Sequence, residues 1–406
     1  MKKLLFIFSF LTLTLIGFAQ EEIAKLTPKA EISLITCGPG EDLYSVFGHS
    51  ALRVNDPGLN IDAVFNYGTF HFSDDFYAKF TMGKLNYMLS VSLFPGFYKG
   101  YVRENRQLIE QVLDLNRAQK QALFEILIIN NKPENRVYLY DFFYNNCSTK
   151  LRDKLEEAVG ENVVFDTSPE EENRSFRQML DYYLLPAMDW SDFGIDLALG
   201  LPCDKKPSNY EDMFLPDELM IAFDKAKIID NGTTKPLVKT TQILYERVPL
   251  ESARFPWFFR PFFLAWLFFF IGLGIAAYEF FKKKDFLFFD RILFGVFGLF
   301  GLFLMFLWFV TDHTATAWNL NVIWVHPLMF FTGFLAFKEK QHPLLKWFFL
   351  AVALWNIVLV AIWGFLPQML HYAAIPLALL IAVRCFMRFY KARWHLHENS
   401  NIETKS

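Results

Sequence analysis

Long apolar runs are confined to the two ends of this 406-residue chain. The first run, Leu4–Ile16, follows two lysines and precedes Gly17-Phe18-Ala19, a pattern typical of a secretory signal at residues 1–19. Beyond residue 250, five further runs reach or approach the roughly twenty residues that cross a bilayer. These predicted spans are 258–281, 292–311, 321–337, 347–366 and 369–389.

Basic residues alternate between the connections of this apolar half. Lysines occupy the first connection (282–284) and the third (338–346), and the tail adds Arg388, Lys391 and Arg393. The second connection, "TDHTATAWNLN", has neither lysine nor arginine. The positive-inside rule therefore places the C-terminus in the cytoplasm. The preceding part then lies on the opposite side of the membrane from the cytoplasm, which agrees with the signal.

The remaining sequence has an ordinary globular mixture of apolar and charged residues. We expect a signal at 1–19, a periplasmic domain with linker at 20–250, a membrane domain at 251–395 and a cytoplasmic tail at 396–406. The net charge is −3, and no basic stripe carries interleaved aromatic residues, so nucleic acid is excluded as a partner. No cofactor is predicted, and no metal-ligand spacing occurs.

The stretch "FYNNCSTKLRD" places Cys147 at a predicted helix start. An aromatic, strand-like run at 137–144 comes before it, and apolar residues at helical spacing come after it. Either Asn145 or Asn146 is a suitable N-cap. In the first helical turn, unpaired N–H groups and the helix dipole stabilise a thiolate. Cys147 is therefore the candidate nucleophile.

A histidine upstream is the candidate base. "DLYSVFGHSALRVNDPG" and "DAVFNYGTFHF" alternate polar and apolar residues on either side of an Asn-Asp-Pro-Gly turn, which predicts a β-hairpin. His49 comes near the start of its first strand. The alternative is a surface or hydrogen-bonded core histidine. A thiol nucleophile, however, needs an imidazole to take its proton and a third polar group to orient that imidazole.

Three segments in this order, "FGHSALRV", "FNYGTF" and "NNCSTKLRD", followed by membrane spans, resemble the Lnb family of Bacteroidetes. The resemblance implies an N-acyltransferase with a phospholipid acyl donor and a diacylated lipoprotein acceptor. The histidine-before-cysteine order is similar to circularly permuted papain-like folds. The fold class we expect is therefore α+β, a circularly permuted papain-like periplasmic domain followed by an α-helical transmembrane domain of about five spans.

The resemblance favours Asn66, in the "NYG" portion, as the third catalytic group, with His71 as the alternative. Tyr44 could line an oxyanion site or belong to the core, and Asn146 could support the thiol. The connection "TDHTATAWNLN" faces the same side as the thiol. Its polar residues could bind a headgroup or the lipoprotein amine, or form an ordinary turn; they include Asp312, His313 and Asn319.

The other cysteines leave two readings open. A periplasmic location permits a Cys37–Cys203 disulfide, but both could equally be unpaired small residues, and Cys385 is expected to pack inertly. Two rival functions also remain. The domain could be a thiol hydrolase that cuts a lipid ester or a peptidoglycan amide with water. Alternatively, it could be a binding module with Cys147 in a disulfide.

Overall fold

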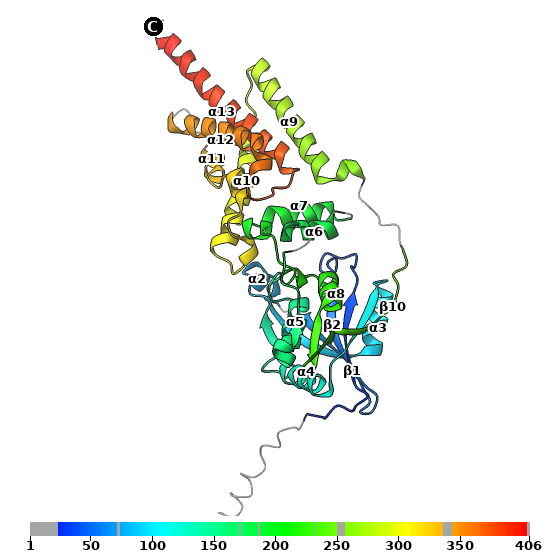
Figure 1. Ribbon diagram of the computed structural model, residues 1–406. Coiled ribbons are helices and arrows are strands. Elements are labelled where there is room, and N and C mark those ends of the chain that lie inside the picture. Colours follow the sequence, from blue (N-terminus) through cyan, green and yellow to red (C-terminus); the bar gives the residue numbers. More distant parts are fainter. Residues whose placement is uncertain are drawn as a thin grey trace, which may run out of the picture.

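The computed structural model describes residues 23–70, 74–169, 172–185, 187–230, 232–249, 256–335 and 343–403. The described chain has two parts (Figure 1). A mixed part of strands and helices comes first, and an all-helical part follows. The predicted signal at 1–19 lies outside the described residues, as does His71.

A seven-stranded antiparallel sheet forms the centre of the mixed part, with strand order β10-β5-β1-β2-β3-β4-β6. The predicted hairpin is confirmed as its middle, where β2 pairs with β3. A smaller sheet has the order β7-β8-β9. The strands are β1 Glu31–Cys37, β2 His49–Asp56, β3 Ile61–Thr69, β4 Asn86–Leu93, β5 Leu108–Leu113, β6 Val137–Leu139, β7 Val163–Val164, β8 Lys227–Asp230, β9 Thr233–Pro236 and β10 Val238–Tyr245.

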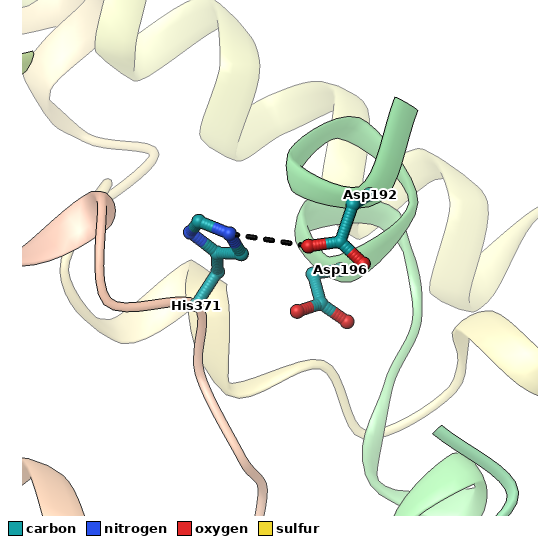
Figure 2. Close-up of side chains that lie close together, drawn as sticks. All are labelled: Asp192, Asp196 and His371. Atoms are coloured by element: carbon teal, nitrogen blue, oxygen red, sulfur yellow. Dashed lines mark ion pairs between the residues drawn. The ribbon is translucent and has the colours of Figure 1, made fainter. Parts of the chain in front are cut away.

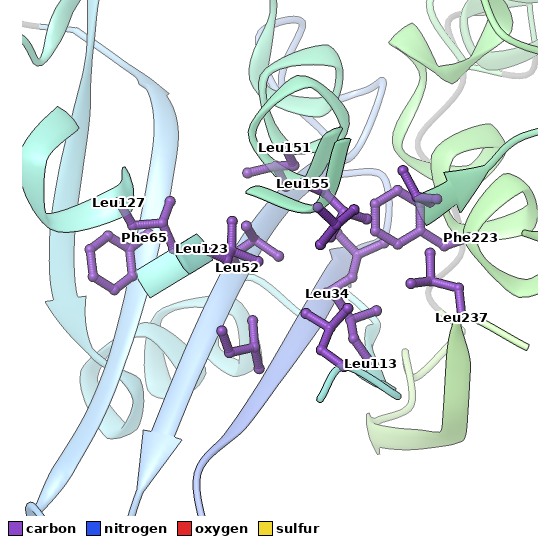
Figure 3. Close-up of a cluster of buried hydrophobic side chains, with 14 of the residues drawn as sticks. Leu34, Leu52, Phe65, Leu113, Leu123, Leu127, Leu151, Leu155, Phe223 and Leu237 are labelled. Atoms are coloured by element: carbon purple, nitrogen blue, oxygen red, sulfur yellow. The ribbon is translucent and has the colours of Figure 1, made fainter. Parts of the chain in front are cut away.

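Successive side chains of a strand point to opposite faces, and both faces of this sheet are covered. Leu34 and Leu52 pair across β1 and β2 and pack with α4 (Arg117–Asn130) and α5 (Cys147–Val159) in the main core (Figure 3). Ile35 and Ala51 form the next pair and face α3 (Phe94–Arg103) instead. Burial on both faces fixes the register, because a one-residue slip would exchange the two sets.

Two further helices, α6 (Phe176–Leu184) and α7 (Asp189–Ala198), lie between the sheet and the all-helical part (Figure 1). Phe176, Met179 and Leu184 of α6 are buried in a cluster with Phe214. The short α2 (Phe76–Thr81) contains no buried residue, whereas α8 (Pro216–Lys225) packs against the main core.

The all-helical part contains α9 (Pro261–Lys282), α10 (Leu287–Phe309), α11 (Met329–Leu335), α12 (Pro343–Ala361) and α13 (Ala374–Glu403). Among the described residues, three stretches are long and apolar enough to cross a membrane. They are Pro261–Lys282, Leu287–Phe309 and Leu344–Ala361. The first, second and fourth predicted spans are thereby confirmed as apolar helices of spanning length.

The third and fifth predicted spans are not among these three helices. The run at 321–337 opens as the 3-10 turn Leu320–Ile323, and α11 begins only after Pro327. Proline lacks the N–H that a continuous helix would need there. Helix α13 carries two buried arginines, which lowers its hydropathy. The total of five spans stays a prediction.

The arginines of α13 are neutralised inside the helical part. Arg384 contacts Glu279 of α9 at 2.7 Å and Asp290 of α10 at 2.6 Å, while Arg388 contacts Asp290 at 2.6 Å. All four side chains are at most 1% exposed. Buried charges in a membrane protein must pair with one another, so this network holds three helices together.

The two parts of the molecule dock at the C-terminus of α7. A helix end leaves backbone carbonyls without intrahelical partners. The Asn319 amide donates to the carbonyls of Leu197 and Ala198 at 2.9 and 3.0 Å, and Gln368 donates to Leu199 at 2.9 Å. Asn321 donates to the Asp196 carbonyl in the same way, at 3.1 Å. Amide side chains of the helical part thus satisfy the end of α7.

Candidate active site

Cys147 is the first residue of α5, as predicted, and Asn146 is the N-cap. The Asn146 side-chain oxygen accepts from the N–H groups of Ser148 and Thr149 at 2.8 and 3.0 Å. In return, the Thr149 hydroxyl accepts from the Asn146 N–H, which completes a capping box. The Asn146 amide also donates to the Phe214 carbonyl. Asn146 therefore fixes where α5 begins, and it does so from a buried position.

His49 opens β2 opposite Cys37, the last residue of β1. The preceding Gly48 has a φ of +79°, and a Cβ there would lie 2.9 Å from the Cys37 carbonyl oxygen. Only glycine suits both the left-handed backbone and this close approach. The turn at Gly48 therefore brings His49 to the edge of the sheet.

Asn66 lies on β3, beside the His49 strand, and its Oδ1 is hydrogen-bonded to His49 Nε2. A carbonyl oxygen only accepts, so Nε2 carries the proton of a neutral imidazole. The other ring nitrogen, Nδ1, is left for a partner on the opposite side of the ring. Cys147 lies close enough to His49 for each to shift the pKa of the other, so the structure brings the three predicted residues together.

The charges of this group favour a thiolate–imidazolium pair. Burial is the largest single influence and raises the pKa of Cys147, but His49, the Ser50 N–H and the Ser148 hydroxyl together bring that pKa below its ordinary value. Burial likewise lowers the pKa of His49, yet Cys147 and Asn66 raise it overall. Opposite shifts of two contacting groups are typical of an activated cysteine.

A second glycine lets β3 approach the thiol. The β3–β4 ladder shifts register between Asn66 and Thr69, and Gly68 within this irregularity has a φ of +85°. A Cβ at Gly68 would lie 3.3 Å from the Cβ of Cys147. Cys147 itself is only 9% exposed. The Cys147 sulfur is therefore closely enclosed by β3 and the start of α5.

The remaining predicted residues lie elsewhere. Tyr44 is 75% exposed and so is not a core residue. The His313 ring is hydrogen-bonded to the Phe80 carbonyl at 2.8 Å, and the Asp312 N–H donates to Met82, so this connection contacts the end of α2. Asn319 is buried in the docking contact with α7. Its amide nitrogen is bound to two carbonyls, which does not fit the predicted headgroup contact.

All four cysteines are free thiols, so the Cys37–Cys203 disulfide and the disulfide-bonded Cys147 are both wrong for this structure. Cys37 packs under α3, whereas Cys203 lies beside α6 and contacts the Ala315 carbonyl at 3.4 Å. The two belong to separate buried clusters. Burial raises the pKa of each thiol to about 12. Both are poor nucleophiles, in contrast to Cys147.

A second polar centre, absent from the sequence-based predictions, lies at the docking surface (Figure 2). Asp192 and Asp196 of α7 and His371 of the connection before α13 have ligand atoms within 4.8 Å of one another. His371 Nε2 lies 3.3 Å from Asp192 Oδ2. The only sequence signal was the Asp-x-x-x-Asp spacing, because His371 is far away in the chain.

The hydrogen bonds of His371 argue against a metal ion at this centre. Its Nδ1 accepts from the Ala373 N–H at 3.0 Å, so Nε2 of the neutral ring holds the proton. That tautomer presents an N–H, and not a lone pair, to Asp192. A metal-bound histidine usually has the reverse arrangement, with its second nitrogen donating.

Asp196 has a different partner from Asp192. It pairs with the buried Arg177 at 2.6 Å, and Arg177 also pairs with Asp204 at 3.1 Å. Asp204 in turn accepts from the Met369 N–H of the helical part at 2.9 Å. The ion pairs of Arg177 therefore extend across the docking surface.

Two family profiles match the chain. The Lnb N-terminal periplasmic domain matches residues 22–181, and the Lnb transmembrane domain matches residues 253–393. The first match includes His49, Asn66 and Cys147. No curated protein and no solved structure matches the chain.

Proposed function

The chain belongs to the Lnb family, and we propose that it is a lipoprotein N-acyltransferase. It is a membrane protein with a periplasmic domain and a transmembrane domain, which supports a place in the bacterial inner membrane. In the proposed reaction, an acyl chain moves from a phospholipid to Cys147. It then moves to the α-amine of a lipoprotein whose N-terminal cysteine carries a diacylglyceryl group.

The observation that carries this proposal is the contact between Cys147 at a helix N-terminus and an imidazole oriented by Asn66. Such an arrangement suits acyl transfer through a thioester. A papain-like description of the domain is part of the proposal, since it rests on these three residues and their order along the chain.

In the first step, the Cys147 thiolate attacks the ester carbonyl of the phospholipid. The new C–S bond replaces the ester C–O bond, and the lysophospholipid oxygen leaves with the proton of the His49 imidazolium. The Asn146 side-chain oxygen accepts hydrogen bonds from the N–H groups of Ser148 and Thr149, whereas the Cys147 N–H is not part of this cap. We assign that N–H to the oxyanion of the tetrahedral intermediate.

In the second step, the lipoprotein amine attacks the thioester. His49 accepts a proton from the amine, the C–N bond forms, and the C–S bond breaks to return the thiolate. Asn66 keeps Nε2 of His49 protonated throughout, so that Nδ1 exchanges the proton in both steps. The enclosure of Cys147 supports this route, because the thioester must be protected from hydrolysis until the amine binds.

Purified enzyme in detergent provides the test. Phospholipid alone should acylate Cys147, release about one equivalent of lysophospholipid per enzyme and then stall. A diacylated lipopeptide with a free α-amine should restart turnover and give a triacylated product, whereas its N-acetylated form should not. Continuous release of free fatty acid without lipopeptide would instead identify the rival thiol hydrolase.

We also propose that the C-terminus is cytoplasmic. The docking connections, around Asn319 and Gln368, lie on the side of the periplasmic domain, and α13 then runs away from that side (Figure 1). A reporter fused after Ser406 should be active only in the cytoplasm. A cysteine in place of the exposed Asp312 should react with a membrane-impermeant maleimide added from the periplasmic side.

A further inference from the structure

A cavity of about 400 Å³ lies where α7 meets the start of α9, and its lining includes none of the three residues of the thiol site. Its rim is aromatic, and its interior includes carboxylates. The exposed rings of Trp257, Phe262 and Tyr372 lie beside the start of α9, a helix long and apolar enough to cross a membrane, and such aromatic residues are typical of the membrane–water interface. The lining residues are Leu185, Asp189, Asp192, Trp257, Arg260, Pro261, Phe262, Phe263, His371 and Tyr372.

Asp192 is the most deeply placed charge of this cavity, and it is 2% exposed. Its Oδ2 contacts His371, but its Oδ1 has no hydrogen-bond partner within the described part of the chain. A buried carboxylate oxygen without a donor is costly. The neighbouring Asp181 has a pKa raised to about 8 by burial, by the charges of Asp196 and Asp192 and by a side-chain hydrogen bond to Asp192, against the opposing charge of Arg177. Asp192 therefore lies in a cluster of three carboxyl groups, in which Arg177 pairs with Asp196.

Among the described residues that line the cavity, Arg260 is a cation that a ligand can reach. Arg260 pairs with Asp189 at 3.2 Å, and its side chain is 42% exposed, so its guanidinium can bind a further anion. A carboxylate inside and a guanidinium at the rim match a zwitterion with its ammonium group inward. Aromatic faces around the ammonium add cation–π attraction, and a guanidinium binds phosphate in a bidentate manner.

We propose that this cavity binds the headgroup of an ethanolamine phospholipid. The ammonium donates to Asp192 Oδ1, the phosphate contacts Arg260, and the acyl chains follow the apolar surface of α9. A choline headgroup has no N–H to donate, so it leaves Asp192 unsatisfied. The amine of a diacylated lipoprotein lacks a neighbouring phosphate for Arg260. The site goes beyond the proposed acyl transfer, because it needs neither Cys147 nor an acceptor.

Native mass spectrometry of the full chain with the Cys147→Ser substitution tests this without turnover. Delipidated protein is titrated with phosphatidylethanolamine, phosphatidylcholine or phosphatidylglycerol that carry the same acyl chains. We expect ethanolamine lipid to bind about tenfold more tightly than choline lipid, the effect of one charged hydrogen bond. Asp192→Asn should abolish this preference, and Arg260→Gln should weaken the binding of all three lipids.

Two matched controls line a different hollow of the periplasmic domain, and neither substitution should change lipid binding: Asp217→Asn and Arg174→Gln. Tyr372→Leu, at the exposed rim, should weaken the binding of ethanolamine lipid, and this test remains even if Asp192→Asn fails to fold. Equal binding of ethanolamine and choline lipids would overturn the proposal. So would displacement of ethanolamine lipid by zinc or calcium ions alone, or stronger binding of a diacylated lipopeptide at this cavity.

Discussion

Two groups of buried polar residues, the thiol site around Cys147 and a docking centre formed by Arg177, Asp196 and Asp204, use buried charge in opposite ways. At Cys147, the cap takes two of the first N–H groups of α5, and the sulfur and imidazole remain as a pair that can exchange a proton. Around Arg177, the guanidinium instead donates to two carboxylates and three carbonyls, and the proton stays on arginine. A reactive centre keeps one group that can change its protonation state, whereas a docking centre uses its hydrogen bonds to hold segments together.

The largest expected effect separates the two centres by activity. Cys147→Ser and His49→Ala should each lower acyl transfer by roughly a thousandfold or more, and the double variant should be hardly worse, because the residues act as a unit. The rate at which labelled phospholipid converts a diacylated lipopeptide to its triacylated form measures this. Cys203→Ala removes another buried thiol and should retain activity. If Cys147→Ser turned over normally, the nucleophile would have to be sought elsewhere.

A substitution in the docking centre should instead lower the free energy of unfolding. Arg177→Met leaves Asp196 and Asp204 buried without their cation, which costs about 3–5 kcal/mol. We expect a clearly lower melting temperature in detergent and faster proteolysis between the two parts. Lys154→Ala, which breaks a more exposed pair on α5, should change stability by about 0.5 kcal/mol at most. Equal melting of wild type and Arg177→Met would contradict a docking role.

A smaller loss is expected at the group that orients the base. Asn66→Ala should lower the rate about tenfold to a hundredfold, since the imidazole loses its partner but keeps its place on β2. The loss should fall on turnover more than on apparent phospholipid affinity. Asn86→Ala, an exposed amide on the neighbouring strand, serves as the control. An equal loss in both variants would point to damage of the sheet.

The mildest probe is the pH dependence of thiol alkylation. His49 lowers the pKa of Cys147 against the effect of burial, so wild-type Cys147 should react with iodoacetamide at a pH where an ordinary thiol is protonated. In His49→Ala, burial remains without its counter-charge, and the reaction should move to higher pH. The same midpoint in both proteins would mean that the two groups do not form an ion pair.

The sequence predicted the thiol centre because each component is local. The N-cap before Cys147 and the hairpin that contains His49 are patterns of a few residues, whereas the family resemblance pointed to Asn66. One choice remained open. Asn145 and Asn146 were equally suitable caps, and the structure has Asn146 as the cap, with its amide donating to the Phe214 carbonyl.

The docking centre could not be predicted in this way. Arg177, Asp196 and Met369 come together from three distant segments, and none belongs to a short motif. The same reason explains the weak fifth span, since Arg384 lowers its hydropathy and the partner Asp290 lies far away in the chain. Asn319 was read as a surface residue because a polar connection between spans usually faces water, whereas here it caps α7.

The amide contacts at the end of α7 also have a mechanical consequence. They fix the periplasmic domain to the connections before α11 and α13, so the reactive sulfur has a set height above the bilayer. The lengths of the apolar helices determine where the bilayer lies. A thinner or thicker membrane then moves the ester bonds of its lipids relative to a stationary thiol. For the proposed acyl transfer, we therefore expect membrane thickness to affect the reaction rate, as it would not for a domain on a flexible tether.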